Sequence, residues 1–175
     1  MNEFLSEESI DLHRAYVRKK RLEFSILESS IPKLSGAEFN KIRRMKLTSR
    51  DSRDALALTA EIRLHDIYFS SFGCSRYQRC GIPLRRYGGE AAFLNEIYRT
   101  ALSQSHGFVC VYLFGDDVNL RASSDAESLL RIGEPTLVLD VCEHAYFMDY
   151  GFDKDRYLIS ALPYLDLSKL TIPTR

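Results

Sequence analysis

An acidic and an imidazole side chain stand close together near residue 140. Asp140 lies near the end of the apolar run 135–141, and His144 follows four residues later. A carboxylate oxygen combined with an imidazole nitrogen suits iron, manganese or zinc better than calcium or magnesium. An Asp at the end of a strand is also a common helix cap. The pair by itself therefore leaves a metal site and a structural cap open.

Strands and short helices are the elements that must position this pair. The run 135–141 predicts a buried strand, and 143–150 predicts the start of a helix. A strand pattern at 108–114 and another at 118–120, joined by a Gly-Asp-Asp turn, predict an antiparallel hairpin. Further helical patterns cover 90–104 and 153–160.

The first part of the chain predicts two long helices. Ser6 followed by two glutamates is typical of a helix start, and apolar residues then recur at helical spacing until Pro32 ends the pattern. A second helical pattern runs from about 51 to 69. The predicted fold class is α+β, with an N-terminal helical hairpin followed by an α/β layer that has a small antiparallel three-stranded sheet and flanking helices.

A segment rich in glycine divides the two parts. Four of the nine glycines, together with Pro83, lie between residues 70 and 89. We therefore predict an N-terminal helical hairpin domain at 1–72, a linker at 73–89 and a C-terminal α+β metal-binding domain at 90–175.

The composition of the chain limits which partners and which cellular compartment we expect. Basic and acidic residues number 24 each, so net charge gives no reason to expect nucleic acid. No apolar run reaches the roughly 18 residues of a membrane span, and the acidic start resembles no secretion signal. The four cysteines form no C-x-x-C pair. We expect reduced thiols and a cytoplasmic protein.

One long motif carries a family resemblance. The stretch from Pro135 to Tyr150, PTLVLDVCEHAYFMDY, closely resembles the D-x-W-E-H-A-Y-Y-x-D-Y segment of iron/manganese superoxide dismutases, in which the Asp and His are metal ligands. Residues 5–13 and 58–69 resemble the family's first two helices, whose histidines are the other ligands. The resemblance implies one iron or manganese ion per chain, held by His13, His65, Asp140 and His144. His106 is left as a surface histidine.

Several residues depart from the family pattern around the metal. The family has a Tyr eight residues after the first ligand His and a His four residues after it, and both are replaced here. Two Trp of the family and the Tyr that follows its H-A-Y are replaced as well. Such neighbours orient ligands and tune bound solvent, so the changes bear on activity. The residues now present are Arg21, Val17, Phe108, Cys142 and Phe147.

Two further positions bear on the choice of metal. The residue four before the second ligand His is Gln in iron-type members and small in manganese-type ones; here it is Glu61. The partner position, sixteen before Asp140, carries Ser124 in place of the manganese-type Gln. The resemblance slightly favours iron. It makes Glu61, Arg21 and Ser124 the candidate catalytic residues.

The family also suggests an ion pair beside the metal. Its Tyr and Gln hydrogen-bond each other, so we predict that Arg21 and Glu61 pair in their place. The alternative is that both are exposed helix charges that never meet.

The resemblance implies a reaction and a partner. The predicted function is disproportionation of superoxide to oxygen and hydrogen peroxide. The alternatives are a diverged non-heme iron or manganese oxidase or oxygenase acting on an organic substrate, and a structural relative without activity, against which the four retained ligands argue. Glu143 matches the Glu that pairs with a ligand His of a second subunit, so we expect a homodimer with Glu143 near the interface.

Overall fold

The computed structural model describes residues 4–46, 49–82 and 84–171. Residues 1–3, in the acidic start, and Pro83, in the predicted linker, lie outside the described part. The α-helices are α1 (Glu7–Ser30), α2 (Phe39–Ile42), α3 (Ser49–Ser70), α4 (Glu90–Ser103), α5 (Ala126–Ile132), α6 (Phe147–Tyr150) and α7 (Lys154–Ala161). The strands are β1 (Phe108–Phe114), β2 (Asp117–Ser123) and β3 (Leu137–Asp140). Short 3-10 turns are η1 (Pro32–Leu34), η2 (Arg85–Tyr87), η3 (Glu143–Ala145), η4 (Leu162–Tyr164) and η5 (Leu167–Lys169).

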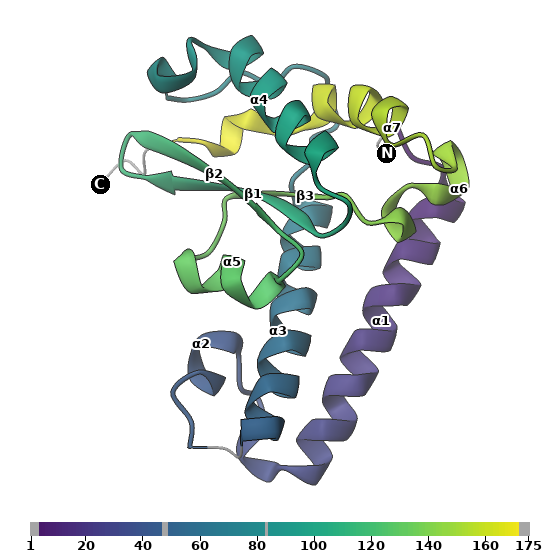
Figure 1. Cartoon of the computed structure of the whole chain (residues 1–175), viewed down its shortest axis with the longest axis vertical. Coiled ribbons are helices and arrows are strands. Elements are labelled where there is room, and N and C mark those ends of the chain that lie inside the picture. The colour runs from purple at the N-terminus through teal and green to yellow at the C-terminus, as the bar shows by residue number, and fades with distance from the viewer. Residues whose placement is uncertain (1–3, 47–48, 83, 172–175) are drawn as a thin grey trace.

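Helices α1 and α3 form the predicted hairpin and lie side by side as two long rods (Figure 1). The start of α1 is capped by Ser6, whose Oγ accepts a hydrogen bond from the backbone N–H of Ser9 at 3.1 Å. The helix ends just before Pro32, as the sequence predicts. These two helices carry the two histidines that the family resemblance assigns as ligands.

The three strands form one antiparallel sheet in the order β2-β1-β3. In this sheet Phe108 at the start of β1 lies opposite Asp140 at the end of β3. The register therefore places the candidate acidic ligand at an edge of the sheet beside the helical hairpin. The predicted α+β fold class is confirmed.

The sheet separates two hydrophobic clusters, and this explains the continuous apolar run of β1. Val109 and Val111 pack in one cluster with residues of α4 and α7. Phe108, Cys110 and Tyr112 pack in the other with residues of α3 and α5. A strand covered on both faces needs apolar residues on both. Ser71, directly after α3, also contacts the sheet, because its Oγ accepts a hydrogen bond from the backbone N–H of Val138 at 2.8 Å.

Two short helices, α2 and α5, are absent from the sequence predictions. Helices of four and seven residues are too short to show a helical period. The predicted helix after Glu143 begins as the 3-10 turn η3 and is interrupted at Tyr146, where φ is −144°. Within the described residues, no helix combines the length and the apolar character needed to cross a lipid bilayer.

The division at 73–89 remains a proposal about the organisation of the chain. This segment contains η2 and connects α3 to α4. Both hydrophobic clusters include residues from before and after it: Phe4 packs in the same cluster as Tyr157, and Leu64 in the same cluster as Leu129.

Candidate metal centre

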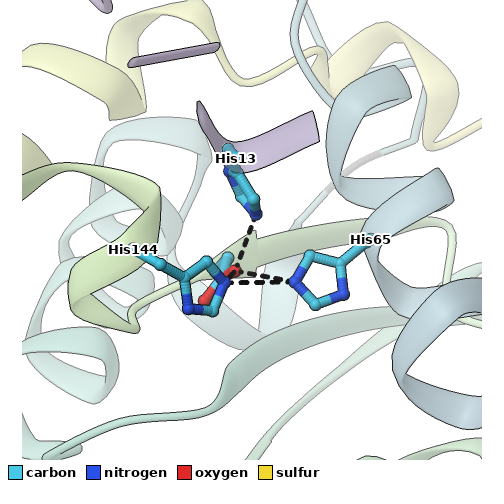
Figure 2. A group of neighbouring side chains, drawn as sticks. His13, His65 and His144 are labelled. Atoms are coloured by element: carbon cyan, nitrogen blue, oxygen red, sulfur yellow. Dashed lines mark hydrogen bonds and ion pairs between the residues drawn. The ribbon is translucent and has the colours of Figure 1, made fainter. Parts of the chain in front are cut away.

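Four side chains from separate elements meet at one point between the helical hairpin and the sheet. His13 comes from α1, His65 from α3, Asp140 from the end of β3 and His144 from η3. Figure 2 shows the three imidazoles directed toward one carboxylate. The four potential ligand atoms all lie within 4.8 Å of one another.

The separations between these atoms fit a single transition-metal ion. The Oδ2 atom of Asp140 lies 3.1 Å from Nε2 of His13, 3.3 Å from Nε2 of His65 and 2.9 Å from Nε2 of His144. The last two nitrogens are 3.2 Å apart. With ligand bonds of about 2.1 Å, neighbouring ligand atoms around one ion are roughly 3 Å apart. Three nitrogens and one oxygen are donors that suit iron or manganese.

Backbone hydrogen bonds orient two of the four ligands. Nδ1–H of His65 donates to the backbone carbonyl of Glu61 at 2.7 Å, which leaves the lone pair of Nε2 directed at the centre. The Oδ1 atom of Asp140 accepts from the backbone N–H of Cys142 at 2.8 Å, which leaves Oδ2 free to bind a metal. The carbonyl of Asp140 in turn accepts from the hydroxyl of the buried Tyr157 at 3.1 Å.

The centre is buried except at one ligand. The side chains of His13, His65 and Asp140 are 0%, 1% and 0% exposed, whereas that of His144 is 24% exposed. Small molecules from solvent therefore reach the centre most directly beside His144.

The buried carboxylate controls the electrostatics of the site. Burial alone raises the pKa of Asp140, but the hydrogen bonds from the three imidazoles outweigh it and hold this pKa well below its usual range. Burial opposes protonation of His65, and the hydrogen bond and charge of Asp140 overcome it, so the pKa of His65 is raised. For His13 burial dominates, and its pKa is lowered. A buried carboxylate of this kind needs a positive partner, which a metal ion bound between the four side chains would supply.

Aromatic rings surround the imidazoles. The rings of Tyr68 and Phe69 lie 4.8 and 4.9 Å from that of His13, centroid to centroid. Phe108, which takes the place of a family Trp, meets the His65 ring edge-on at 5.1 Å. These aromatic rings pack against the imidazoles of the inner candidate ligands.

Tyr16 is a site residue that the sequence analysis missed. Its ring stacks on that of His144, with centroids 4.1 Å apart and planes 17° apart. Tyr16 lies three residues after His13 on α1, and this spacing places both on one face of a helix. That spacing is the signal by which Tyr16 could have been found from the sequence.

The predicted ion pair between Arg21 and Glu61 is wrong. Arg21 is half-exposed, and its Nη2 lies 2.5 Å from Oδ1 of Asp66. The carboxylate of Glu61 is instead 3.0 Å from Nζ of Lys20. Successive helix residues point about 100° apart, so the rotation of α1 turns Lys20 toward Glu61 and Arg21 away from it.

The other predicted site residues lie farther out. Ser124 is exposed just after β2, and no hydrogen bond between it and the four ligands is found among the described residues. Cys142 is half-buried, and its Sγ accepts a hydrogen bond from the backbone N–H of Gly107 at 3.1 Å. Val17 is buried and Phe147 is exposed. His106 lies on the surface, where the sequence analysis places it.

Comparison with known proteins agrees with this geometry. The family model described as iron/manganese superoxide dismutases, C-terminal domain, matches residues 84–171, half of the chain. The match includes Asp140 and His144, and the two remaining ligands lie on the helices that precede it. No curated protein matches the chain. The protein belongs to the iron/manganese superoxide dismutase family.

Proposed function

We propose that this protein is a superoxide dismutase that holds one iron or manganese ion per chain, with iron favoured by the residues at positions 61 and 124. Two superoxide anions and two protons would yield one oxygen and one hydrogen peroxide. The observation that carries the proposal is the convergence of three imidazole nitrogens and one carboxylate oxygen within 4.8 Å. A bound ion of this kind supplies two oxidation states, so that one superoxide loses an electron and the next gains one.

The protein's own residues prepare the site for this chemistry. Burial excludes water from His13, His65 and Asp140, and the negative charge of Asp140 offsets part of the positive charge of the ion. The exposed edge of His144 leaves the approach for a small anion on one side. Glu61 contributes at this side of the site as well, through its carbonyl to His65 and its carboxylate to Lys20.

Two of the three candidate catalytic residues keep a proposed role. Glu61 places a negative charge near the metal, which favours the higher oxidation state. Ser124 occupies the family's partner position, where manganese-type members carry Gln. We propose that this position therefore contributes no amide to the metal centre, as in the iron type. Arg21, paired with Asp66 on the surface, is assigned no role at the metal.

The test begins with protein purified with its native metal. The metal is identified by mass spectrometry, and superoxide consumption is followed by stopped-flow absorbance. Fast consumption that is abolished in His144→Ala but retained in His106→Ala, which changes a surface histidine, supports the proposal. Metal-loaded protein that consumes superoxide no faster than free metal refutes it.

A cavity beside His13 favours a second candidate, an oxidase or oxygenase of an organic substrate. This cavity of about 410 Å³ is lined by apolar and aromatic side chains together with the charged residues Glu7, Asp11 and Arg14, and His13 lies in its wall. Cavities of this size hold small organic molecules. Metal-loaded protein that is slow with superoxide, yet consumes oxygen when small aromatic compounds are added, would establish this candidate instead. The apolar and aromatic part of the lining is formed by Phe4, Leu5, Ile10, Tyr68, Phe69 and Phe72.

We also propose a two-fold homodimer with Glu143 near the interface. Glu143 is exposed and precedes the ligand His144. Close to it in the chain, the apolar side chains of Phe147, Met148 and Phe152 are 43%, 49% and 85% exposed. Large apolar side chains exposed together are typical of protein interfaces, and a two-fold axis would place one such surface against its copy.

The cytoplasm is the compartment we propose. All four cysteines are free thiols. Burial raises the pKa of Cys110 to about 12 and also raises that of Cys142. Unpaired thiols held in the protonated form fit a reducing compartment.

A further inference from the structure

The three ligand imidazoles are held in place by different means. His65 is oriented by the hydrogen bond from its Nδ1 to the carbonyl of Glu61. His13 is fully buried and packed between the rings of Tyr68 and Phe69. His144 has neither support, since it is partly exposed and no hydrogen bond to its Nδ1 is found in the described part of the chain. The Nε2 atom of His144 contacts Asp140 and His65 at the centre, and a further contact is needed to fix the plane of the ring.

That contact is the stacked ring of Tyr16. A separation of 4.1 Å between centroids and an angle of 17° between planes bring the two rings into face-to-face van der Waals contact. A ring held against one face of an imidazole prevents rotation about χ2, because rotation would drive the imidazole edge into its neighbour. Tyr16 thus limits His144 to orientations in which Nε2 stays near Oδ2 of Asp140.

Tyr16 is itself held from both helices of the hairpin. Lys20, one turn later on α1, places its Nζ 5.4 Å from the centroid of the Tyr16 ring. The same Nζ lies 3.0 Å from Oε2 of Glu61 on α3 and 3.8 Å from Oε2 of Glu23. With carboxylates on two sides, Lys20 is a weak attractor of anions but a well-anchored contact for the ring.

We propose that Tyr16 is a positioning residue of the metal centre, that its ring sets the orientation of His144, and that the Lys20–Glu61 ion pair holds the ring in place. The inference rests on the proposed metal-dependent function, because it assigns a purpose to the stack only if His144 is a ligand. In this inference Lys20, the residue before Arg21, forms the ion pair with Glu61 that the sequence analysis assigns to Arg21. The stack itself is measurable without metal.

The first experiment uses metal-free protein and NMR of the histidine ring protons. The current in the Tyr16 ring shifts the proton resonances of a stacked His144 ring upfield. We expect this shift in the wild type and in Tyr16→Phe, a clear loss in Tyr16→Leu and a partial loss in Lys20→Met. Lys19→Met is the matched control, because it removes the same charge from an exposed neighbouring residue and is expected to leave the shift unchanged.

The second experiment uses the metal-loaded full chain. Loss of a group that orients a ligand typically lowers metal affinity by about 10- to 100-fold. We expect metal affinity to fall by about 10-fold in Tyr16→Leu and by less in Lys20→Met, and to stay near the wild-type value in Tyr16→Phe and Lys19→Met. The midpoint potential of the bound metal should shift only in Tyr16→Leu and Lys20→Met. Circular dichroism shows whether each variant folds.

The results separate this inference from the proposed function. If the wild type binds iron or manganese and Tyr16→Leu leaves the His144 resonances, the affinity and the potential unchanged, the inference is overturned and the metal site stands. If Tyr16→Phe loses as much as Tyr16→Leu, the hydroxyl and not the stacked ring is responsible, which also overturns it. If the wild type binds neither metal, the proposed function itself fails.

Discussion

Glu61 and His65, one turn apart on α3, are joined by a hydrogen bond from the imidazole Nδ1 to the Glu61 carbonyl at 2.7 Å. The side chain of the same glutamate reaches across to Lys20 on α1. One residue therefore orients His65 through its backbone and places a negative charge near the candidate metal centre through its side chain. The two roles can be separated by substitution, because a change of side chain leaves the carbonyl in place.

The variant Glu61→Gln removes the charge and retains the carbonyl. We expect it to raise the midpoint potential of the bound metal, since the negative charge that favours the higher oxidation state is gone. The free energy of unfolding should change by less than about 1 kcal/mol, because the ion pair between Glu61 and Lys20 is partly solvent-exposed. Redox titration followed by absorbance measures the potential.

Glu23→Gln is the matched control for this prediction. Glu23 also contacts Lys20, but at 3.8 Å and from the more exposed side. We expect the midpoint potential of the metal bound to Glu23→Gln to stay close to that of the wild type. Equal shifts in both variants would show that the potential responds to general surface charge and not to Glu61.

Metal affinity should rise with pH through the titration of His65. Asp140 raises the pKa of His65, so a proton competes with the metal for Nε2 up to a pH above the ordinary imidazole value of 6.5. In Asp140→Asn the charge that raises this pKa is lost. We expect weaker binding of Mn²⁺ at every pH, with the rise in affinity displaced to lower pH. Calorimetric titrations between about pH 5 and 8 measure both effects; a rise at the same pH in both proteins would contradict the prediction.

Tyr157 should stabilise the end of β3 through its hydrogen bond to the backbone of Asp140. It is fully buried, donates a hydrogen bond to the carbonyl of Asp140, and its hydroxyl lies 3.3 Å from that of Tyr68. The variant Tyr157→Phe leaves buried oxygens without a partner, which costs about 1–3 kcal/mol. Urea unfolding measures the change. Tyr77→Phe, at a residue that is 68% exposed, is expected to unfold like the wild type.

The proposed dimer should depend on the exposed aromatic residue Phe152. Its side chain is 85% exposed and contacts the ring of Phe147 at 5.1 Å. We expect Phe152→Asp to convert the dimer into monomers, because it would bury charge at an apolar interface. Analytical ultracentrifugation measures the mass. Leu22→Asp places the same charge at an exposed leucine of α1 and should leave the dimer intact.

Local patterns were sufficient for the long elements and for part of the site. The cap at Ser6 and the break at Pro32 predict α1, and the apolar run 108–114 predicts a strand. The resemblance carried by the motif around Asp140 and His144 implies two ligands four residues apart, and in the structure a short turn brings these two side chains together. The elements and this approach can be predicted because each depends on interactions between residues near one another in the chain.

The surroundings of the ligands were decided by tertiary structure. The resemblance places Arg21 next to Glu61, whereas the packing of α1 on α3 turns Lys20 toward it and stacks Tyr16 on His144. A helix residue and its neighbour point about 100° apart, so the rotation of α1 about its axis decides which of the two faces Glu61. That rotation is set by the side chains packed between the two helices and the sheet, and no local pattern in the chain records it.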